Sequence, residues 1–350
     1  MRRLGLVLTA LLLAACGAEE ARAPFADSRI PPSLAPRFHP PEGWAWGFVQ
    51  IGEAPPQRYG VAATPGAPQA HVLILTGSGE TAEAWFETVR DLNGRGYAVW
   101  VLERTAQGGS GRYTPVRDLV HVPSFDPDIA AARAMETVVI RPGVEQPLVV
   151  IGHGAGGLVA LRAVQSGLAA DGLILSAPVV DDAGLRRSEP QAVWARRLAL
   201  GWLRLPDAPW EREGPDAHAR GLTGDVRRGV VQHAWQIANP DLRMGGPSLG
   251  WTAAFLEASD AAKGQLADMQ APVLMLTAGR DAHTAAAART CAALPHCVEH
   301  RLADARPALH LERDTARLPW LEAVDAFVRK RIGARRPALS TNDRAGAHGL

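Results

Sequence analysis

The sequence predicts an α/β protein in which a mostly parallel sheet is flanked by helices, with a helical segment inserted late in the chain. Two observations support this class. Short apolar runs alternate with helical patterns, as in proteins built from strand–helix–strand units. Several runs, such as residues 72–75, are continuously apolar, which is typical of strands buried on both faces of a sheet.

The expected elements follow one another between about residues 42 and 334, which we assign to one domain. An antiparallel hairpin at 45–51 and 57–63 opens it. Strands are expected at 71–76, 97–102, 147–152, 172–178, 272–278 and 298–302, with helices near 82–94, 126–140, 156–166 and 314–332.

The interval from 179 to about 266 breaks this alternation. It carries five tryptophans on mostly helical patterns, and we interpret it as an inserted lid. Trp194, Leu198 and Trp202 fall on one helical stripe. Two interpretations of the stripe stay open: it forms the lid's own core, or it lines a groove for an acyl chain.

The N-terminus carries an export signal. Arg2 and Arg3 precede an apolar run from Leu4 to Leu13, and Leu-Ala-Ala-Cys ends at Cys16. The pattern resembles a bacterial lipoprotein signal, in which the cysteine is lipidated and becomes the first mature residue. The run is too short for a spanning helix. We therefore expect a signal at 1–16, a lipid anchor on Cys16 and a periplasm-facing protein at the bacterial envelope; a plain secretory signal or short membrane anchor is the alternative.

The remaining cysteines agree with an exported protein. Cys291 and Cys297 lie close together in the sequence, and in an oxidising compartment we expect a disulfide between them. Closing so short a loop would stabilise the fold by about 2 kcal/mol in the chain-entropy model.

Composition and the two ends of the chain bound the remaining possibilities. The 37 Lys and Arg balance 36 Asp and Glu, so no basic face for nucleic acid is indicated. No His, Cys or Asp cluster has ligand spacing, so we predict neither metal nor cofactor.

Residues 17–41 are Ala/Pro-rich and predict a flexible tether, and 335–350 predict a disordered tail. The oligomeric state is not predicted.

A family resemblance rests on several motifs. The run 152–157, Gly-His-Gly-Ala-Gly-Gly, mirrors Gly-His-Ser-x-Gly-Gly at a nucleophile elbow. The segments 102–112, 123–134, 222–228 and 245–251 are similar to further landmarks, and the two nearby cysteines also have counterparts. Together they resemble the α/β-hydrolase fold, in the lysophospholipase and monoglyceride-lipase branch grouped with serine aminopeptidases. The resemblance covers roughly residues 60–332.

The resemblance implies ester hydrolysis by a Ser-His-Asp triad with an oxyanion hole. Asp281 stands at the position of the acid, just past an expected strand. The oxyanion loop corresponds to residues 76–79, so the backbone N–H groups of Ser78 and Ala155 would form the hole.

Two members of the implied triad are missing. Gly154 occupies the nucleophile position and offers no oxygen. Pro307 falls at the position of the base, with His310 three residues later. Losing a triad member typically lowers turnover by roughly 10⁶. The sequence therefore predicts a tethered, non-catalytic homologue.

Three functions remain open at this point. The protein could bind a lipid or acylated small molecule, which predicts an open apolar cavity ending near Gly154. It could be an interaction protein, which predicts a filled cavity. The third is an active carboxylic-ester hydrolase with a relocated nucleophile, Ser78, served by His310 and Asp281. His153 is interpreted as a structural hydrogen-bonding residue.

Overall fold

The fold is built around one eight-stranded sheet. The computed structural model describes residues 24–116, 118–204 and 209–335. The strands lie in the order β1-β2-β4-β3-β5-β6-β7-β8. They are β1 (Ala45–Val49), β2 (Gln57–Ala62), β3 (Ala70–Leu75), β4 (Tyr97–Leu102), β5 (Leu148–His153), β6 (Gly172–Ser176), β7 (Val273–Ala278) and β8 (Cys297–Leu302).

The sheet is mostly parallel, as the sequence predicts. The hairpin β1–β2 is antiparallel, with Ala45 opposite Val61, and β2 joins β4 antiparallel. Every pair from β4 through β3 to β8 is parallel. Because parallel strands all point the same way, their carboxyl ends meet at one edge, where α/β proteins build their sites.

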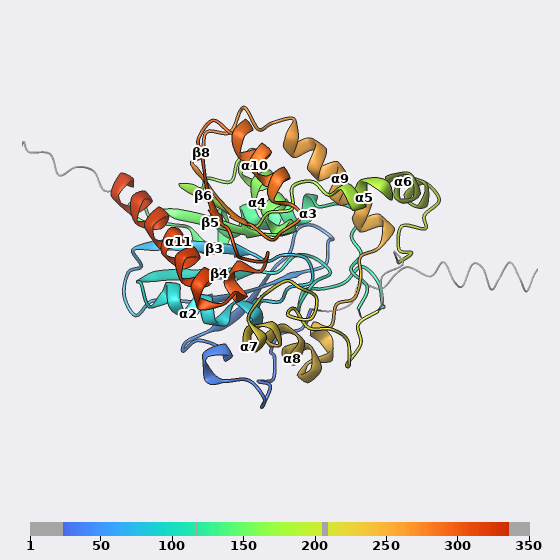
Figure 1. Cartoon of the computed structure of the whole chain (residues 1–350), viewed down its shortest axis with the longest axis horizontal. Helices are drawn as coiled ribbons and strands as arrows, with labels where there is room; N and C mark the ends of the chain where they lie inside the picture. Colours follow the sequence, from blue (N-terminus) through green and yellow to red (C-terminus); the bar gives the residue numbers. More distant parts are fainter. Residues whose placement is uncertain (1–23, 117, 205–208, 336–350) are drawn as a thin grey trace, which may run out of the picture.

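Helices cover both faces of the sheet (Figure 1). The helices of the main layers are α2 (Phe86–Asn93), α3 (Asp126–Ala134), α4 (Ala155–Gln165), α9 (Leu249–Lys263), α10 (Thr284–Ala293) and α11 (Asp314–Arg335). Short helical turns occur at η1 (Pro36–Phe38), η2 (Ala82–Trp85), η3 (Met135–Ile140), η4 (Pro240–Leu242) and η5 (Leu309–Leu311). Among the described residues, no helix is both long enough and apolar enough to span a bilayer.

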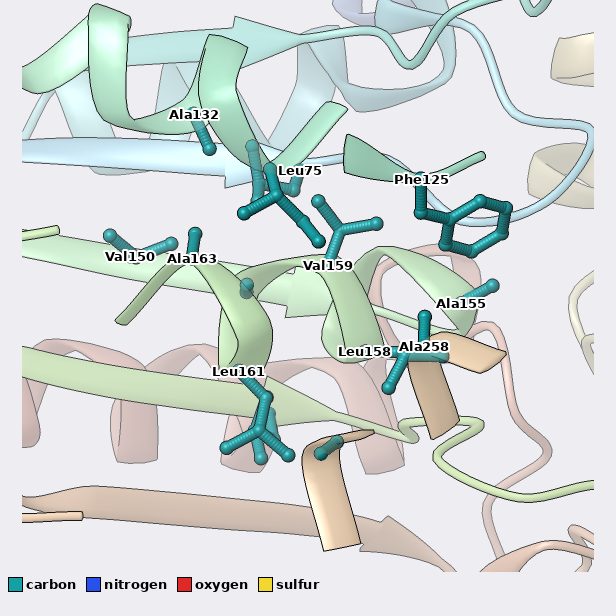
Figure 2. Close-up of a cluster of buried hydrophobic side chains, with 14 of the residues drawn as sticks. Leu75, Phe125, Ala132, Val150, Ala155, Leu158, Val159, Leu161, Ala163 and Ala258 are labelled. Atoms are coloured by element: carbon teal, nitrogen blue, oxygen red, sulfur yellow. The ribbon is translucent and has the colours of Figure 1, made fainter. Parts of the chain in front are cut away.

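Alternation along the central strands divides the core between the two faces. In β3, Leu73 and Leu75 belong to one cluster with α3, α4 and α9, whereas Val72 and Ile74 belong to the other with α2 and α11. Figure 2 shows the first cluster, with Val159 of α4 close to Leu75. Burial on both sides explains why these strands are apolar throughout.

A helical insertion separates β6 from β7. It contains α5 (Ala183–Arg187), α6 (Glu189–Arg197), α7 (Val226–Gly229) and α8 (Val231–Ala238), and α9 leads from it back to the sheet. Asp182 and Ser248 begin α5 and α9 by accepting the N–H groups of Leu185 and Trp251, which is how Asp and Ser favour helix starts.

Both interpretations of the Trp194 stripe are wrong. Trp194, Leu198 and Trp202 are 61%, 63% and 46% exposed, so they are not the insertion's core. They are also absent from the lining of the cavity described below. The expected helical stripe is also interrupted, because α6 ends at Arg197 and only Trp194 lies in it. Helices α5 and α6 project at the side of the molecule (Figure 1).

The predicted tether is also wrong over its described part. Leu34 and Phe38 are buried against Phe86 and Trp235. The Arg29 N–H donates to Asn239 Oδ1 at 2.7 Å. Residues 24–41 therefore pack on the domain, because two apolar side chains anchor a segment whose composition resembles a linker. Residues 17–23, the predicted signal with Cys16, and the predicted tail from 336 onward lie outside the described residues.

The two remaining cysteines are joined. A disulfide links Cys291, on α10, to Cys297, the first residue of β8. It connects a helix on one face of the sheet to the outermost strand at the β8 edge.

A buried ion-pair network fixes the loops at the carboxyl edge of the sheet. The Arg58 guanidinium lies 2.8 Å from Glu83 Oε1 and 2.7 Å from Glu103 Oε1, and all three side chains are fully buried. Glu103 also accepts the N–H groups of Ala82 and Gly109 at 2.7 Å each. One carboxylate thus ties the loop after β3 to the loop after β4.

Replacing Arg58 by Met should destabilise the fold by about 3–5 kcal/mol, since it leaves two buried carboxylates without a counter-charge. Urea unfolding followed by circular dichroism measures the change. The control is Arg301→Met, because Arg301 is exposed on β8. A change at Arg58 no larger than at Arg301 would contradict a structural role for this network.

Candidate active site

The strand-to-helix turn between β5 and α4 has the conformation of a nucleophile elbow. Gly154 lies between them with φ +53° and ψ −125°. Its N–H donates to the Ser176 carbonyl at 3.2 Å, and its carbonyl accepts the N–H of Val179 at 2.9 Å. Glycine adopts positive φ readily, whereas a side chain in such a conformation costs roughly 1–3 kcal/mol. The turn thus keeps the backbone conformation of a nucleophile elbow, and the glycine at its tip adopts that conformation without strain.

Space for a nucleophile remains at the tip. A Cβ built on Gly154 would meet only the Gly77 Cα, at 3.6 Å, an ordinary contact. Two residues later the situation is reversed, since a Cβ on Gly156 would lie 2.4 Å from the Leu75 carbonyl oxygen. Gly156 is required by the close approach of α4 to β3, but Gly154 is not required by sterics.

The three triad positions meet in one cavity of about 770 Å³, whose lining includes Gly154, Asp281 and Pro307. Most of its lining is apolar, from both the sheet edge and the insertion. The sequence-derived positions therefore converge in space, but only Asp281 carries a side chain able to serve in a triad.

Ser78 and Ala155 also line this cavity. No described residue accepts a hydrogen bond from the backbone N–H of either. Both are thus placed at the cavity with an N–H donor available, which is the requirement for an oxyanion hole.

Asp281 has a different partner from the one a triad needs. Its Oδ1 lies 3.0 Å from Nδ1 of His283, and Nε2 of His283 lies 2.9 Å from Asp182 Oδ2. The hydrogen bonds with Asp182 and Asp281 raise the pKa of His283 to about 10. The hydrogen bond from His283 in turn lowers the pKa of Asp182 to about 2. An imidazolium held between two carboxylates does not act as a general base near neutral pH.

The relocated triad does not assemble. Ser78 is exposed, and its Oγ accepts a hydrogen bond from Arg104 at 3.1 Å. His310 is buried and stacks on Trp85, with ring centroids 3.7 Å apart. Burial lowers the pKa of His310 to about 3. No hydrogen bond joins Ser78, His310 and Asp281 to one another.

A cluster that the sequence analysis missed lies beside the elbow. Nδ1 of His153 is 3.0 Å from Glu80 Oε1, and Nε2 of His310 is 3.6 Å from the same oxygen. Burial would raise the pKa of Glu80, but the two histidines, His153 foremost, lower it to about 2. Burial would likewise lower the pKa of His153, but the Glu80 carboxylate raises it. No local pattern in the sequence marks Glu80 as a partner of the two histidines, because positions 80, 153 and 310 are far apart in the chain.

Comparisons with known proteins agree with this geometry. The family model for serine aminopeptidases (S33) matches residues 66–310. The chain belongs to this serine aminopeptidase family. Monoglyceride lipases and other α/β-hydrolases share its fold, as the sequence resemblance implies. A search of curated protein sequences finds no match.

Several solved structures are similar over most of their length. A soluble variant of monoglyceride lipase from Saccharomyces cerevisiae matches with TM-score 0.61 and 16% identity, covering 87% of this chain and 97% of that one. Monoacylglycerol lipase from Paleococcus ferrophilus matches with TM-score 0.58 and 16% identity, over 78% and 98%. A carboxyl esterase from Bacillus coagulans gives 0.63 and 13%, over 82% and 99%. These similarities show that the chain has the α/β-hydrolase fold.

The ion pair between His283 and Asp182 predicts that the stability of the fold depends on pH. The pKa of His283, about 10, exceeds the ordinary 6.5, so the stabilisation by His283 is complete below pH 6.5 and disappears as pH rises through about 10. The pKa of Asp182, about 2 against 3.8, adds stability that is present above pH 3.8 and lost as pH falls through about 2. The pair stabilises most between these limits.

We expect His283→Gln to lower the free energy of unfolding by about 2 kcal/mol at pH 6, less than the full shift because the side chain is partly exposed. The loss should shrink steadily at pH 8 and pH 10 in urea unfolding. His300→Gln, at an exposed position on β8, is the control. An effect of His283→Gln that is independent of pH would show that His283 is uncharged in the folded protein.

Proposed function

We propose that the protein is a membrane-tethered, non-catalytic member of its family that binds a lipid or other acylated molecule. One observation carries the proposal. The cavity of about 770 Å³ is present at the elbow, yet neither Gly154 nor Pro307 at its lining supplies the hydroxyl or imidazole of a triad. The binding space of a hydrolase is thus present without two of its three reacting groups.

The absence of catalysis follows from the chemistry of the two residues. Acyl transfer needs an oxygen to attack the carbonyl and a base to take its proton. Asp281 is engaged with His283, which Asp182 also holds as a cation. Among the described residues, Ser78 is the one serine that lines the cavity, and its Oγ accepts a hydrogen bond from Arg104 rather than donating to a base.

The cavity suits an acyl chain with a polar end. Its size lies within the range of small-molecule sites, about 300–1,000 Å³. Val179, Met244, Trp251 and Phe255 contribute to an apolar lining, part of which comes from the insertion acting as a lid. At the elbow, the N–H groups of Ser78 and Ala155 are available for a carbonyl or carboxylate oxygen. A protein that acted only through its outer surface would have no need for this space.

Membrane location is supported by two separate features. The lipoprotein-like signal predicts a lipid on Cys16. In addition, the exposed side chains of Trp194, Leu198 and Trp202 follow or precede the exposed Arg197, whose guanidinium lies over the Trp194 ring. Apolar and aromatic side chains with flanking cations are typical of segments that lie in the interface of an anionic bilayer. We assign this face of α6 and the following turn to contact with the membrane surface.

The membrane assignment predicts that the chain from residue 24 onward, lacking the lipid, binds phosphatidylglycerol vesicles weakly. Changing Trp194, Leu198 and Trp202 together to Ser should weaken binding at least fivefold in co-sedimentation. Val138→Ser with Val144→Ser is the matched control, since both valines are exposed elsewhere. Equal binding of the triple variant would contradict a membrane role for α6.

The lipid anchor is tested separately, by palmitate incorporation into the full chain. Incorporation that persists in Cys16→Ser would contradict the anchor.

The ligand assignment predicts that Val179→Trp, which places an indole in the cavity, weakens binding of a fluorescent fatty acid at least tenfold, about 1.4 kcal/mol. Val138→Trp adds the same group at an exposed site and should leave binding unchanged. Oleoyl lysophospholipid should displace the probe. Equal affinity in both variants would place the ligand outside the cavity. Release of fatty acid that Ser78→Ala abolishes would instead establish an active carboxylic-ester hydrolase.

A further inference from the structure

We propose that Glu80, His153 and His310 form a binding site for one divalent transition-metal ion, best suited to Zn²⁺, at the wall of the cavity beside Gly154. The three side chains come from the loop after β3, the end of β5 and η5. Their ligand atoms all lie within 4.8 Å of one another. None of the three side chains belongs to the triad positions Gly154, Asp281 and Pro307, although two of them share the lining of the same cavity.

The spacing of the ligand atoms fits a small ion. A tetrahedral Zn²⁺ with bonds near 2.1 Å holds its ligand atoms about 3.4 Å apart. Glu80 Oε1 lies 3.0 Å from His153 Nδ1 and 3.6 Å from His310 Nε2. Shifts of a few tenths of an ångström bring both pairs to this separation, and the two histidine nitrogens lie within 4.8 Å of each other. Two histidines and one glutamate are also a known protein ligand set for zinc.

The His310 ring nitrogens make no hydrogen bond within the described part of the chain, and His310 is 1% exposed. His153 Nδ1 is also buried and faces the Glu80 carboxylate 3.0 Å away. Buried polar atoms without partners are costly and rare in native proteins. A cation bound by all three side chains would satisfy them together.

The surrounding residues hold the three ligands as outer partners of a metal site do. Nε2 of His153 donates to the Pro307 carbonyl at 3.1 Å, which directs Nδ1 toward Glu80. Glu80 Oε2 accepts the Gly77 N–H at 2.6 Å and the Trp85 indole N–H at 3.3 Å, leaving Oε1 for the ion. The same Trp85 ring stacks on His310, with an interplanar angle of 5°, and fixes its plane.

One coordination position would remain open toward the cavity. Glu80 and His153 both line the cavity, whereas His310 lies behind them. A water or an oxygen of the bound ligand would complete the tetrahedron from that side. The sequence analysis predicts no metal because it depends on local spacing, whereas these three residues stand far apart in the chain, at positions 80, 153 and 310.

The test is a titration of the full chain, purified in detergent without a histidine tag and stripped with chelator. Co²⁺ is added at pH 8 and followed by its visible absorption, and Zn²⁺ is then added in competition. We expect one Co²⁺ per chain, with the intense bands of a tetrahedral site, displaced by one Zn²⁺.

Two variants locate the site. His310→Phe keeps an aromatic ring on Trp85 and removes both nitrogens, and Glu80→Gln keeps an oxygen for the Gly77 N–H. Each should bind the ion at least tenfold more weakly, whereas His300→Ala, at an exposed position, should not. Near-ultraviolet circular dichroism checks folding, and Glu80→Gln decides the case where His310→Phe does not fold. Absence of tetrahedral Co²⁺ bands in the wild type, or unchanged binding in Glu80→Gln, would overturn the proposal.

Discussion

The close approach of α4 to β3 at Gly156 is the constraint on which the rest of this site depends. There is no room for a Cβ between Gly156 and the Leu75 carbonyl, so the helix must start where it does. Gly154, directly before that start, has positive φ, and Ala155, the first residue of α4, lines the cavity. The elbow is therefore maintained by packing beneath it, independently of any side chain at its tip. A nucleophile can be absent while the fold of a hydrolase is unchanged.

The charges around the elbow are arranged for a site without triad chemistry. Asp281 would be a buried anion without a histidine at position 307, but His283 supplies the positive charge and Asp182 shares it. On the other side of Gly154, Glu80 is held by His153 and by the Gly77 N–H. Each carboxylate thus has a partner that does not depend on a catalytic base. The strain that a nucleophile would impose on the elbow is also absent, which favours stability over activity.

Much of the fold could be predicted from the sequence because it depends on local periodicity. Continuous apolar runs identified the strands, and the glycine-rich turn after β5 identified the elbow and hence Gly154. Other features depend on packing between distant segments. Trp194, Leu198 and Trp202 have helical spacing, but α6 ends at Arg197, and nothing local shows that all three side chains are exposed. Similarly, residues 24–41 resemble a linker in composition, yet Leu34 and Phe38 find a buried site on α2 and α8.

The residues of the candidate site are likewise only partly predictable from the sequence. Asp281, Ser78 and Ala155 could be placed from motif and strand order alone. His310 could not, since three residues beyond Pro307 a side chain can point to the cavity or into the core, and here it stacks on Trp85. The pairing of His283 with two carboxylates, and the gathering of Glu80 with two histidines, required the tertiary structure, because their members are brought together only at the carboxyl edge of the sheet.

The central claim is that the binding site is intact and only two reacting groups are missing. The most direct test compares fatty-acid release from monoglyceride and lysophospholipid by the wild type, Ser78→Ala and the triple variant Gly154→Ser, Pro307→His and His283→Gln. We predict that the wild type and Ser78→Ala both stay at background and that the triple variant rises above them, since the elbow has room for the hydroxyl and removal of His283 frees Asp281 for the new histidine. Wild-type turnover that Ser78→Ala abolishes, or a folded triple variant that stays at background, would contradict the account.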